Sequence, residues 1–316
     1  MKSKQHKKRQ HTLPKHCFLK PFAISRSSSS DLCTWVHNFG KHPRQTNLNE
    51  ISVVNDFYTF FGSDGKKDDQ LEDFLEFAEE KLSCTIHKLI DQKNDLGFTI
   101  LERMDIASFV AMMIVRTPQY RKQFENVMNV FDLACQKYKK GFDPVETIRK
   151  VSNVPIGKIG FKPENIKYYE SFFKNNLMRK NAHVLTLWKQ CESNAQILFE
   201  RMHWNFIIAK DGLEFVTCDD PVGRFDEYNR KTMVGLSQKT VCIYFPISPD
   251  LCFYANYDDS IPVRRNLPSI CIKANEDEVE LINNRMMQCA HRDVYSYSED
   301  PGISSKMMNS DDKPII

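Results

Sequence analysis

Apolar residues recur at intervals of three and four along residues 71–89, and this spacing predicts an amphipathic helix. The apolar positions are Leu71, Phe74, Leu75, Ala78, Leu82, Ile86 and Leu89. Asp68 or Asp69 precedes the stripe as a candidate N-cap, and acidic side chains cover the other faces. We therefore expect a helix to about Gln92 with one side in the core.

Two further helical patterns follow, and the first is apolar on nearly all sides. It includes the run Ala107 to Val115, which predicts a buried helix. Pro118 should end or kink this helix, because proline lacks the N–H group that a helix interior uses. Residues 141–163 are rich in proline and glycine and are expected to form a connector, after which helical spacing returns from about Pro163 to Met202.

The hydrophobic period changes from about four to two after Met202, which is typical of β-strands. Trp204 to Ala209 and Leu213 to Cys218 are strand-like and are joined by Asp211-Gly212, a strong signal for a β-hairpin. Val241 to Phe245 and Leu251 to Ala255 are also strand-like and are predicted to form a second hairpin around a Ser-Pro-Asp turn. Ser269 to Ile272 is a further strand-like run.

The order of these elements, helices first and hairpins later, predicts an α+β fold. A helical segment should pack on a mostly antiparallel sheet, and a last helix is expected from Glu276 to Tyr295. A short strand-like run, Cys33 to His37, is expected to join the same sheet.

Length allows one large domain or two intimately packed units, and we expect a single domain over residues 10–300. The chain has 316 residues, of which 41% are hydrophobic, enough for one substantial core. Within the domain we expect a helical part at 68–202, a sheet at 203–275 and the C-terminal helix at 276–295. The flanking segments 1–9 and 301–316 are expected to be disordered, because neither can bury enough apolar surface to offset the entropy lost on ordering.

Positive charge is concentrated at the N-terminus, although the net charge is only +3. The first twenty residues hold seven lysines and arginines and no acidic residue. Such a basic arm could contact nucleic acid through its phosphates, and a solvated tail is the alternative. The remainder is close to neutral, which argues against a broad nucleic-acid-binding face.

The cysteines and the lack of long apolar runs predict a cytoplasmic protein without membrane association. The ten cysteines include no C-x-x-C pair, so neither a zinc ribbon nor a redox dithiol is indicated. The N-terminus lacks the apolar stretch of a signal peptide, and no apolar run approaches the ~20 residues of a membrane helix. The sequence carries no signal for an oligomeric state.

Short motifs spread over about residues 10–296 carry a family resemblance. They are Gln10-His11-Thr12-Leu13-Pro14 with Leu19 and Phe22-Ala23; Asp56-Phe57-Tyr58; Leu71-Glu72 leading to Glu79; Arg116-Thr117-Pro118; Phe215 to Val222; Phe245 to Pro249; and Asn283. In this order they resemble the domain-of-unknown-function 4238 family. The family usually reads Ser-Asp-Asn-Pro where this chain has Cys218-Asp219-Asp220-Pro221. The resemblance implies a shared fold and a shared site, without naming a reaction.

Four polar residues within these motifs are candidates for chemistry. His11 lies on extended backbone before a proline and could transfer protons or bind a metal, or it could pack locally. Arg116 ends a buried helix and needs a partner, either Glu79 in a structural pair or a bound anion. Asp219 ends a strand before a turn, where it could act in a site or only shape the turn; of the adjacent Asp219 and Asp220, at most one should face a site.

Two classes of function are compatible with these residues. In the first, His11 is a base or metal ligand, Glu79 and Asp219 are carboxylates, and Arg116 clamps an anion, which would suit hydrolysis of a phosphodiester with a divalent metal as a candidate cofactor. In the second, the protein is a non-catalytic binding or interaction protein whose polar pocket is structural or binds an anion. The phosphate loop, HExxH helix and GxSxG elbow are all absent from the sequence.

Both classes make the same geometric prediction. His11, Glu79, Arg116 and Asp219 should meet in one polar pocket between the helical half and the sheet, because buried charges are costly unless they are paired.

Overall fold

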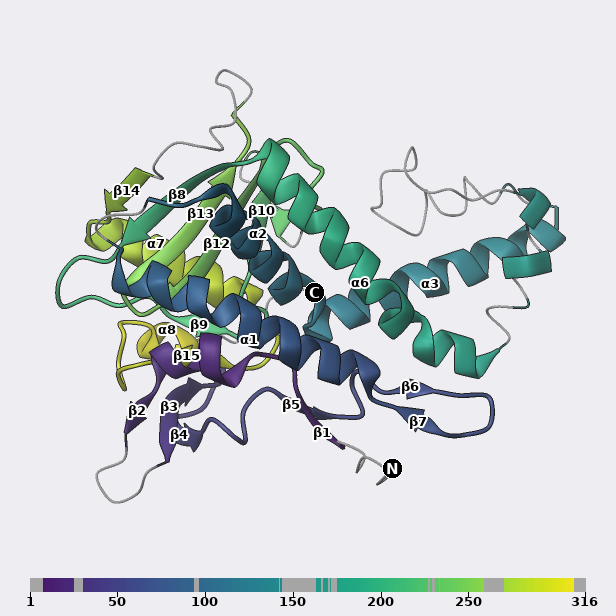
Figure 1. Cartoon of the computed structure of the whole chain (residues 1–316), viewed down its shortest axis with the longest axis horizontal. Coiled ribbons are helices and arrows are strands. Elements are labelled where there is room, and N and C mark those ends of the chain that lie inside the picture. The colour runs from purple at the N-terminus through teal and green to yellow at the C-terminus, as the bar shows by residue number, and fades with distance from the viewer. Residues whose placement is uncertain are drawn as a thin grey trace.

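A computed structural model of the chain describes residues 8–25, 31–93, 97–141, 143, 163–165, 167–169, 171, 175–226, 228, 231–232, 234–258 and 270–309. It confirms the α+β fold. Helices and antiparallel sheets form adjoining layers. Helices α3 (Pro118–Lys139) and α6 (Asn176–Arg201) extend away from the sheets (Figure 1).

Among the described residues, the predicted helical half consists of four long helices. The second begins earlier than its apolar run, because Thr99 and Glu102 form a capping box that satisfies the first free N–H groups. Pro118 is the first residue of the third helix, a position where its missing N–H group costs nothing. The helices are α1 (Gln70–Asp91), α2 (Ile100–Val115), α3 (Pro118–Lys139) and α6 (Asn176–Arg201).

The main sheet has six strands in the order β11-β10-β12-β13-β8-β14. All neighbours are antiparallel except β14, which runs parallel to β8. The hairpin predicted around the Ser-Pro-Asp turn is confirmed as β12 and β13. The strands are β8 (His203–Ile208), β10 (Gly223–Asp226), β11 (Lys231–Thr232), β12 (Val241–Ser248), β13 (Leu251–Asn256) and β14 (Ile270–Lys273).

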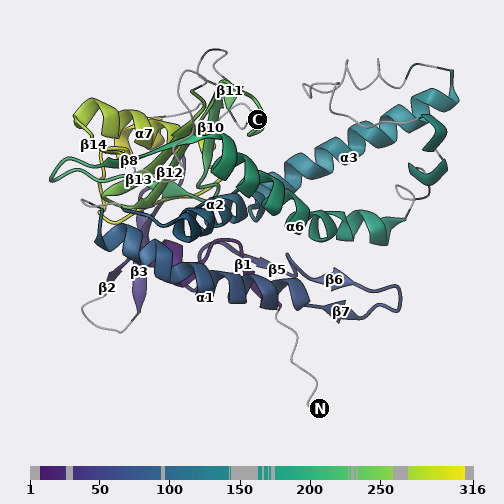
Figure 2. The same ribbon diagram turned by 45° about the horizontal axis from the view of Figure 1, so that its top comes forward.

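Alternation along the strands divides the core between the two faces of this sheet. On β12, Ile243 and Phe245 belong to the core that includes α2, whereas Tyr244 belongs to the core that includes the C-terminal helix α7 (Glu276–Cys289). Figure 2 shows α2 between the sheet and α1. Phe109 of α2 contacts Phe245 at a centroid distance of 6.0 Å. The sheet is thus covered on both faces.

A second sheet joins segments from the two ends of the chain. Its order is β2-β3-β15-β9, and β4 pairs with β3. The prediction that the strand Cys33 to His37 joins the main sheet is therefore wrong. The Thr34 hydroxyl donates to the carbonyls of Phe22 and Ser296, both 2.9 Å away, which fixes this strand beside β15. The strands are β2 (Ile24–Ser25), β3 (Leu32–His37), β4 (Arg44–Asn47), β9 (Thr217–Cys218) and β15 (Val294–Ser296).

Short elements precede α1. They are β1 (Arg9–His11), a π-helical turn η1 (Lys15–Leu19), a 3₁₀ turn η2 (Lys20–Phe22), β5 (Val53–Asn55), β6 (Phe60–Phe61) and β7 (Lys67–Asp68). β1 pairs with β5, and β6 pairs with β7. One further 3₁₀ turn, η4 (Pro163–Asn165), follows α3.

The hairpin predicted across Asp211-Gly212 is wrong. Gly212 does form a tight turn with φ of +83°. Both edges of β8 are occupied by β13 and β14, however, so the chain leaves the sheet after the turn. The Phe215 N–H group donates to the Pro249 carbonyl at 2.6 Å, and Thr217–Cys218 become strand β9 of the second sheet.

The C-terminal end differs from expectation in two respects. Helix α7 ends at Cys289 rather than near Tyr295, because Val294–Ser296 form β15. After Pro301, where a disordered tail was expected, the short helix α8 (Ser304–Asn309) buries Met307 in the core beside α7. Residues 310–316 lie outside the described residues, as do 1–7 of the basic arm and 144–162 of the expected connector.

Two global features complete the description. Within the part of the chain that the structure describes, no helix is both long and apolar enough to cross a bilayer. All ten cysteines are free thiols.

Candidate functional site

Arg116 occupies the C-cap of α2 and is one of the largest fully buried side chains in the described protein. Each of its three guanidinium nitrogens donates a hydrogen bond. Nη1 donates to Glu79 Oε1 at 2.6 Å, Nη2 to the His11 carbonyl at 2.9 Å, and Nε to Tyr58 Oη at 3.3 Å. The predicted Arg116–Glu79 ion pair is therefore present, and it ties α1, α2 and the N-terminal strand together.

Tyr58 and Gln10 extend this network toward the N-terminus. The Tyr58 hydroxyl donates to the Arg116 carbonyl at 3.0 Å, so it both donates to and accepts from the same residue. The Tyr58 N–H group donates to Gln10 Oε1 at 2.6 Å, and Gln10 Nε2 donates to Thr59 Oγ1 at 3.1 Å. Because Gln10 is fully buried, these bonds compensate for its lost hydration.

A polar cavity of about 540 Å³ lies over the ion pair, between η1 and α1. We call it the polar cavity. Its lining residues are His11, Lys15, His16, Cys17, Glu72, Glu76, Glu79, Glu80, Ser83 and Arg116. Three of the four predicted site residues, His11, Glu79 and Arg116, therefore come together.

Burial sets the protonation states at this cavity. It lowers the pKa of His11, and the nearby Lys15 and Arg116 charges act in the same direction, so the imidazole is neutral at pH 7. Its Nε2 atom is buried without a hydrogen-bond partner among the described residues. Burial and the Glu79 carboxylate raise the pKa of the Cys17 thiol to about 12, so Cys17 is not a thiolate nucleophile.

Asp219 does not line this cavity, so the prediction that all four residues meet in one pocket is wrong. Its carboxylate accepts from the backbone N–H groups of His291 (2.8 Å), Arg292 (2.9 Å) and Asp293 (3.3 Å). These bonds hold the turn between α7 and β15. Burial, with the Asp293 charge, raises the pKa of Asp219 to about 7.

The prediction that Asp219 is the inward-facing one of the two adjacent aspartates is wrong. Asp220, not Asp219, faces the helices. Its Oδ1 accepts a hydrogen bond at 3.2 Å from the hydroxyl of Thr117, the residue that follows Arg116. Asp220 is almost fully buried, and burial raises its pKa to about 6, against the opposing influence of Arg224. The alternation of side chains along extended backbone puts the two carboxylates on opposite sides. Only the buried helix end at Thr117 could have indicated which one points inward.

Metal binding finds little support in the donor geometry. Within the described residues, no three His, Cys, Asp or Glu side chains are grouped as a metal ion would require. At Arg116, the Glu79 carboxylate is already paired with the guanidinium, so it offers a metal ion no uncompensated charge.

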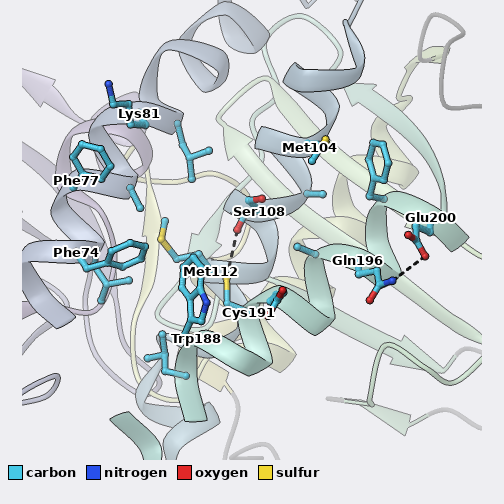
Figure 3. A pocket seen from close by; sticks show the side chains of 18 residues that line it. Phe74, Phe77, Lys81, Met104, Ser108, Met112, Trp188, Cys191, Gln196 and Glu200 are labelled. Carbon is cyan, nitrogen blue, oxygen red and sulfur yellow. Dashed lines mark hydrogen bonds between the residues drawn. The ribbon is translucent and has the colours of Figure 1, made fainter. Parts of the chain in front are cut away.

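A second cavity, which the sequence did not predict, lies on another side of α1. It is a groove of about 670 Å³ between α1, α2 and α6, and we call it the apolar groove (Figure 3). Phe74, Phe77 and Trp188 stand along it, and Cys191 Sγ lies 3.9 Å from the Ser108 carbonyl at its floor. The helical stripe had placed Phe74 in the core, but 39% of it is exposed. In the sequence, the aromatic residues Phe74 and Phe77 at the side of that stripe were the available signal for the groove.

The motifs that carry the family resemblance are bonded to one another across the fold. Gln10 bonds Tyr58, Arg116 bonds Tyr58 and Glu79, and Thr117 bonds Asp220. Asn283 of α7 accepts from the Val216 N–H group at 2.9 Å and donates to the Glu214 carbonyl at 2.9 Å. The motifs therefore supply the hydrogen bonds that connect the N-terminal segment, the helices and the sheets.

This arrangement defines an α+β protein in which a buried Arg–Glu pair joins the N-terminal segment to the helical layer. The chain belongs to the family described as "Protein of unknown function (DUF4238)", whose model matches residues 9–300. The resemblance inferred from the motifs is thereby confirmed. Comparison with curated proteins and with solved structures gives no match.

Proposed function

We propose that this protein is a binding protein whose polar cavity holds a ligand with a primary ammonium or guanidinium group. The observation that carries the proposal is the charge of the lining side chains. Four glutamates line the cavity against two cations, Lys15 and Arg116. A ligand rich in N–H donors and positive charge complements such a surface.

The bonds of Arg116 separate this proposal from binding of an anion. An arginine clamp needs free N–H groups in the plane of the guanidinium to bind a phosphate or carboxylate. Each guanidinium nitrogen of Arg116 already donates one bond within the protein, so only the second N–H groups of Nη1 and Nη2 remain, and the residue is 1% exposed. Its charge is matched by Glu79, and three further glutamates, Glu72, Glu76 and Glu80, line the same cavity.

His11 supports the same ligand class. Burial lowers the pKa of His11, so its imidazole is neutral and adds no positive charge to the lining of the cavity. Lys15 is held toward Asn49 by a 2.8 Å bond from Nζ to Oδ1, so its amine is directed to a neighbouring loop. The lining therefore carries more acidic than basic side chains.

Hydrolysis is a second candidate function, favoured by the same histidine. A neutral imidazole near pH 7 can act as a general base, and a carboxylate beside it could orient a substrate amine. The phosphodiester substrate considered from the sequence is less suited to this cavity, because an anionic substrate would face the glutamates and no free arginine. The basic arm lies mostly outside the described residues, so a nucleic-acid partner stays a prediction.

Calorimetric titration of the full chain with spermidine and with arginine amide tests the proposal. We expect saturable binding that weakens with added salt and weakens several-fold in Glu80→Gln, since Glu80 is exposed at the cavity and its loss should not disturb folding. Glu125→Gln on α3 makes the same charge change away from the cavity and should bind as the unmodified chain does. Binding of inorganic phosphate instead of the amines would overturn the proposal. Turnover of a bound amide or ester would favour the hydrolase.

A further inference from the structure

The apolar groove has the walls of a helical bundle that lacks one helix. On α1, Phe74, Phe77, Ala78 and Lys81 line it, which is the i, i+3, i+4, i+7 spacing of one helix face. The α6 wall shows the same spacing at positions 188, 191, 192 and 195. Stripes of this kind normally pack against another helix.

The depth of the groove comes from small residues between large ones. Ala78, Ala107, Ser108 and Ala195 line its length together with the bulky side chains of Phe77, Met104, Met112, Trp188 and Phe199. In Figure 3, side chains from α1 lie on one side and those from α6 on the other, with Ser108 and Met112 of α2 between them. Phe74 and Trp188 meet edge to face at 4.8 Å and narrow one end. Such alternation offers holes for the side chains of an incoming helix.

Exposure at the rim indicates an occupant wider than the groove itself. Phe77 is 55% exposed and Trp188 is 54% exposed, so neither is enclosed by the protein's own packing. Leu101 precedes Met104 by three positions on α2, and Leu185 precedes Trp188 by three on α6; both leucines are more than half exposed. A small ligand is largely enclosed by its pocket, whereas a protein partner covers rim and floor together.

Dimensions fit about four turns of helix. The α6 wall runs from Leu187 to Glu200, which at 1.5 Å per residue is about 20 Å. A helix with its side chains is about 10 Å across. The groove volume of about 670 Å³ therefore takes the side chains of one helix face and leaves the opposite face in solvent.

Charges on the two walls give the occupant an orientation. Lys81 is the cation on the α1 wall, and its Nζ lies 5.4 Å from the Phe77 ring centroid. Glu192 and Glu200 are acids on the α6 wall. A complementary helix would carry acidic residues along the flank above α1 and basic residues along the flank above α6.

We propose that the apolar groove docks an amphipathic helix of a partner protein, with its apolar face between α1 and α6, its acidic flank at Lys81 and its basic flank at Glu192 and Glu200. This inference is independent of the ligand proposed for the polar cavity, because the two surfaces share no lining residue.

Peptide binding to the full chain tests it. The probe is a fluorescein-labelled peptide of about 14 residues with leucines at i, i+3, i+4, i+7 and i+11, glutamates on one flank and lysines on the other. We expect saturable anisotropy with a Kd in the micromolar range. Unlabelled peptide should shift the Trp188 emission to shorter wavelength in a Trp35→Phe background, because docking removes that indole from water while Trp204 is already buried.

Variants locate the binding and its polarity. Phe77→Glu should weaken binding at least tenfold, whereas Leu281→Glu, which makes the same kind of change on a comparably exposed position of α7, should not. Exchanging the lysine and glutamate flanks of the peptide should weaken binding, and Lys81→Glu combined with Glu192→Lys should restore it for the exchanged peptide.

Three outcomes would overturn the proposal. The first is absence of saturable peptide binding up to about 100 µM, or binding that Phe77→Glu leaves intact. The second is concentration-dependent self-association that Phe77→Glu abolishes without any peptide binding, which would make a second copy of this chain the occupant. The third is a Trp188 emission shift with laurate but not with peptide, which would assign the groove to a small apolar ligand.

Discussion

Helix α1 contributes to two cavities of similar size that have opposite chemistry. The polar cavity is built on a buried ion pair whose cation has no free nitrogen, and the apolar groove is lined by aromatic side chains that remain half exposed. In the first, the buried Arg116 charge is compensated within the protein by Glu79. In the second, apolar surface is left in water. The difference indicates that the Arg116 network stabilises the fold, while the groove is suited to contact another molecule.

Removing the buried cation should give the largest effect. Arg116→Met leaves the Tyr58 hydroxyl and the His11 carbonyl without their donor and Glu79 without its counter-charge, so we expect a loss of about 3–5 kcal/mol in the free energy of unfolding. Urea unfolding followed by circular dichroism measures it. The control is Lys66→Met, because Lys66 also pairs with a carboxylate, Asp64, but their side chains are 85% and 56% exposed, and it should remain close to the unmodified chain. A loss for Arg116→Met of only about 1 kcal/mol would remove the contrast between the two cavities.

Asp219 should make the free energy of unfolding depend on pH. Its folded pKa of about 7 lies above the unfolded value of about 3.9. The folded chain therefore keeps a proton that the unfolded chain loses between these values, and this group makes stability fall as pH rises from about 4 to about 7. Asp219→Asn cannot ionise, so the unfolding free energy of the variant relative to the unmodified chain should rise across that window and level off above it.

Denaturant titrations at several pH values measure this difference. Asp211→Asn, in the exposed turn after β8, serves as the control and should follow the unmodified chain at every pH. A constant offset for Asp219→Asn between pH 4 and 8 would contradict the prediction and indicate an aspartate that stays ionised in the folded protein.

Ligand binding at the two cavities should respond differently to acid. A protonated His11 would repel a cationic ligand, and burial holds its folded pKa below 6.5. Spermidine affinity should therefore be flat near neutrality and fall, by at most about tenfold per pH unit for this group, as pH drops through the folded pKa. The mid-groove contacts are apolar, so peptide affinity should change less over the same range. Calorimetry and anisotropy in matched buffers compare the two, and equal pH profiles would argue that both ligands use one site.

The smallest effect is expected from truncating an exposed aromatic residue of the groove. Phe77→Ser should change the unfolding free energy by no more than about 0.5 kcal/mol, because more than half of the ring is already in water. Phe109→Ser provides the opposite reference, since Phe109 is fully buried and its loss should cost several-fold more. Thermal unfolding of both variants measures the difference. A large destabilisation by Phe77→Ser would make the groove part of the core.

Much of the helical half could be predicted from the sequence because its signals are local. The three- and four-residue spacing located α1, the apolar run located α2, and Pro118 marked the boundary of α3. The β half was harder, because strand partners are set by competition between distant segments. Gly212 supplies the turn that the sequence predicts, but the choice of β13 and β14 as neighbours of β8 depends on residues more than forty positions away.

The site shows the same division. The Arg116–Glu79 pair could be anticipated, because a charge at the end of a buried helix needs a counter-charge. The position of Asp219 could not, because its partners are backbone N–H groups of residues 291–293, which leave no mark in the side-chain sequence. The apolar groove was missed for a related reason. Leu185 and Trp188 have a helical spacing suitable for burial, but the packing of α1, α2 and α6 decides which apolar side chains of a helix stay exposed.

The pairing of β3 with β15 also has a consequence for the order of events during synthesis. The Thr34 hydroxyl bonds the carbonyl of Ser296, 262 positions later. At about 5–20 residues per second, a ribosome needs tens of seconds to add the missing strand after β3 has emerged. If β2, β3 and β4 pair before then, their sheet has an unpaired edge until β15 arrives, and such an edge can recruit other strands. Completion of the second sheet is therefore a late, long-range step, and chaperone dependence of the nascent chain should end only once β15 has left the exit tunnel.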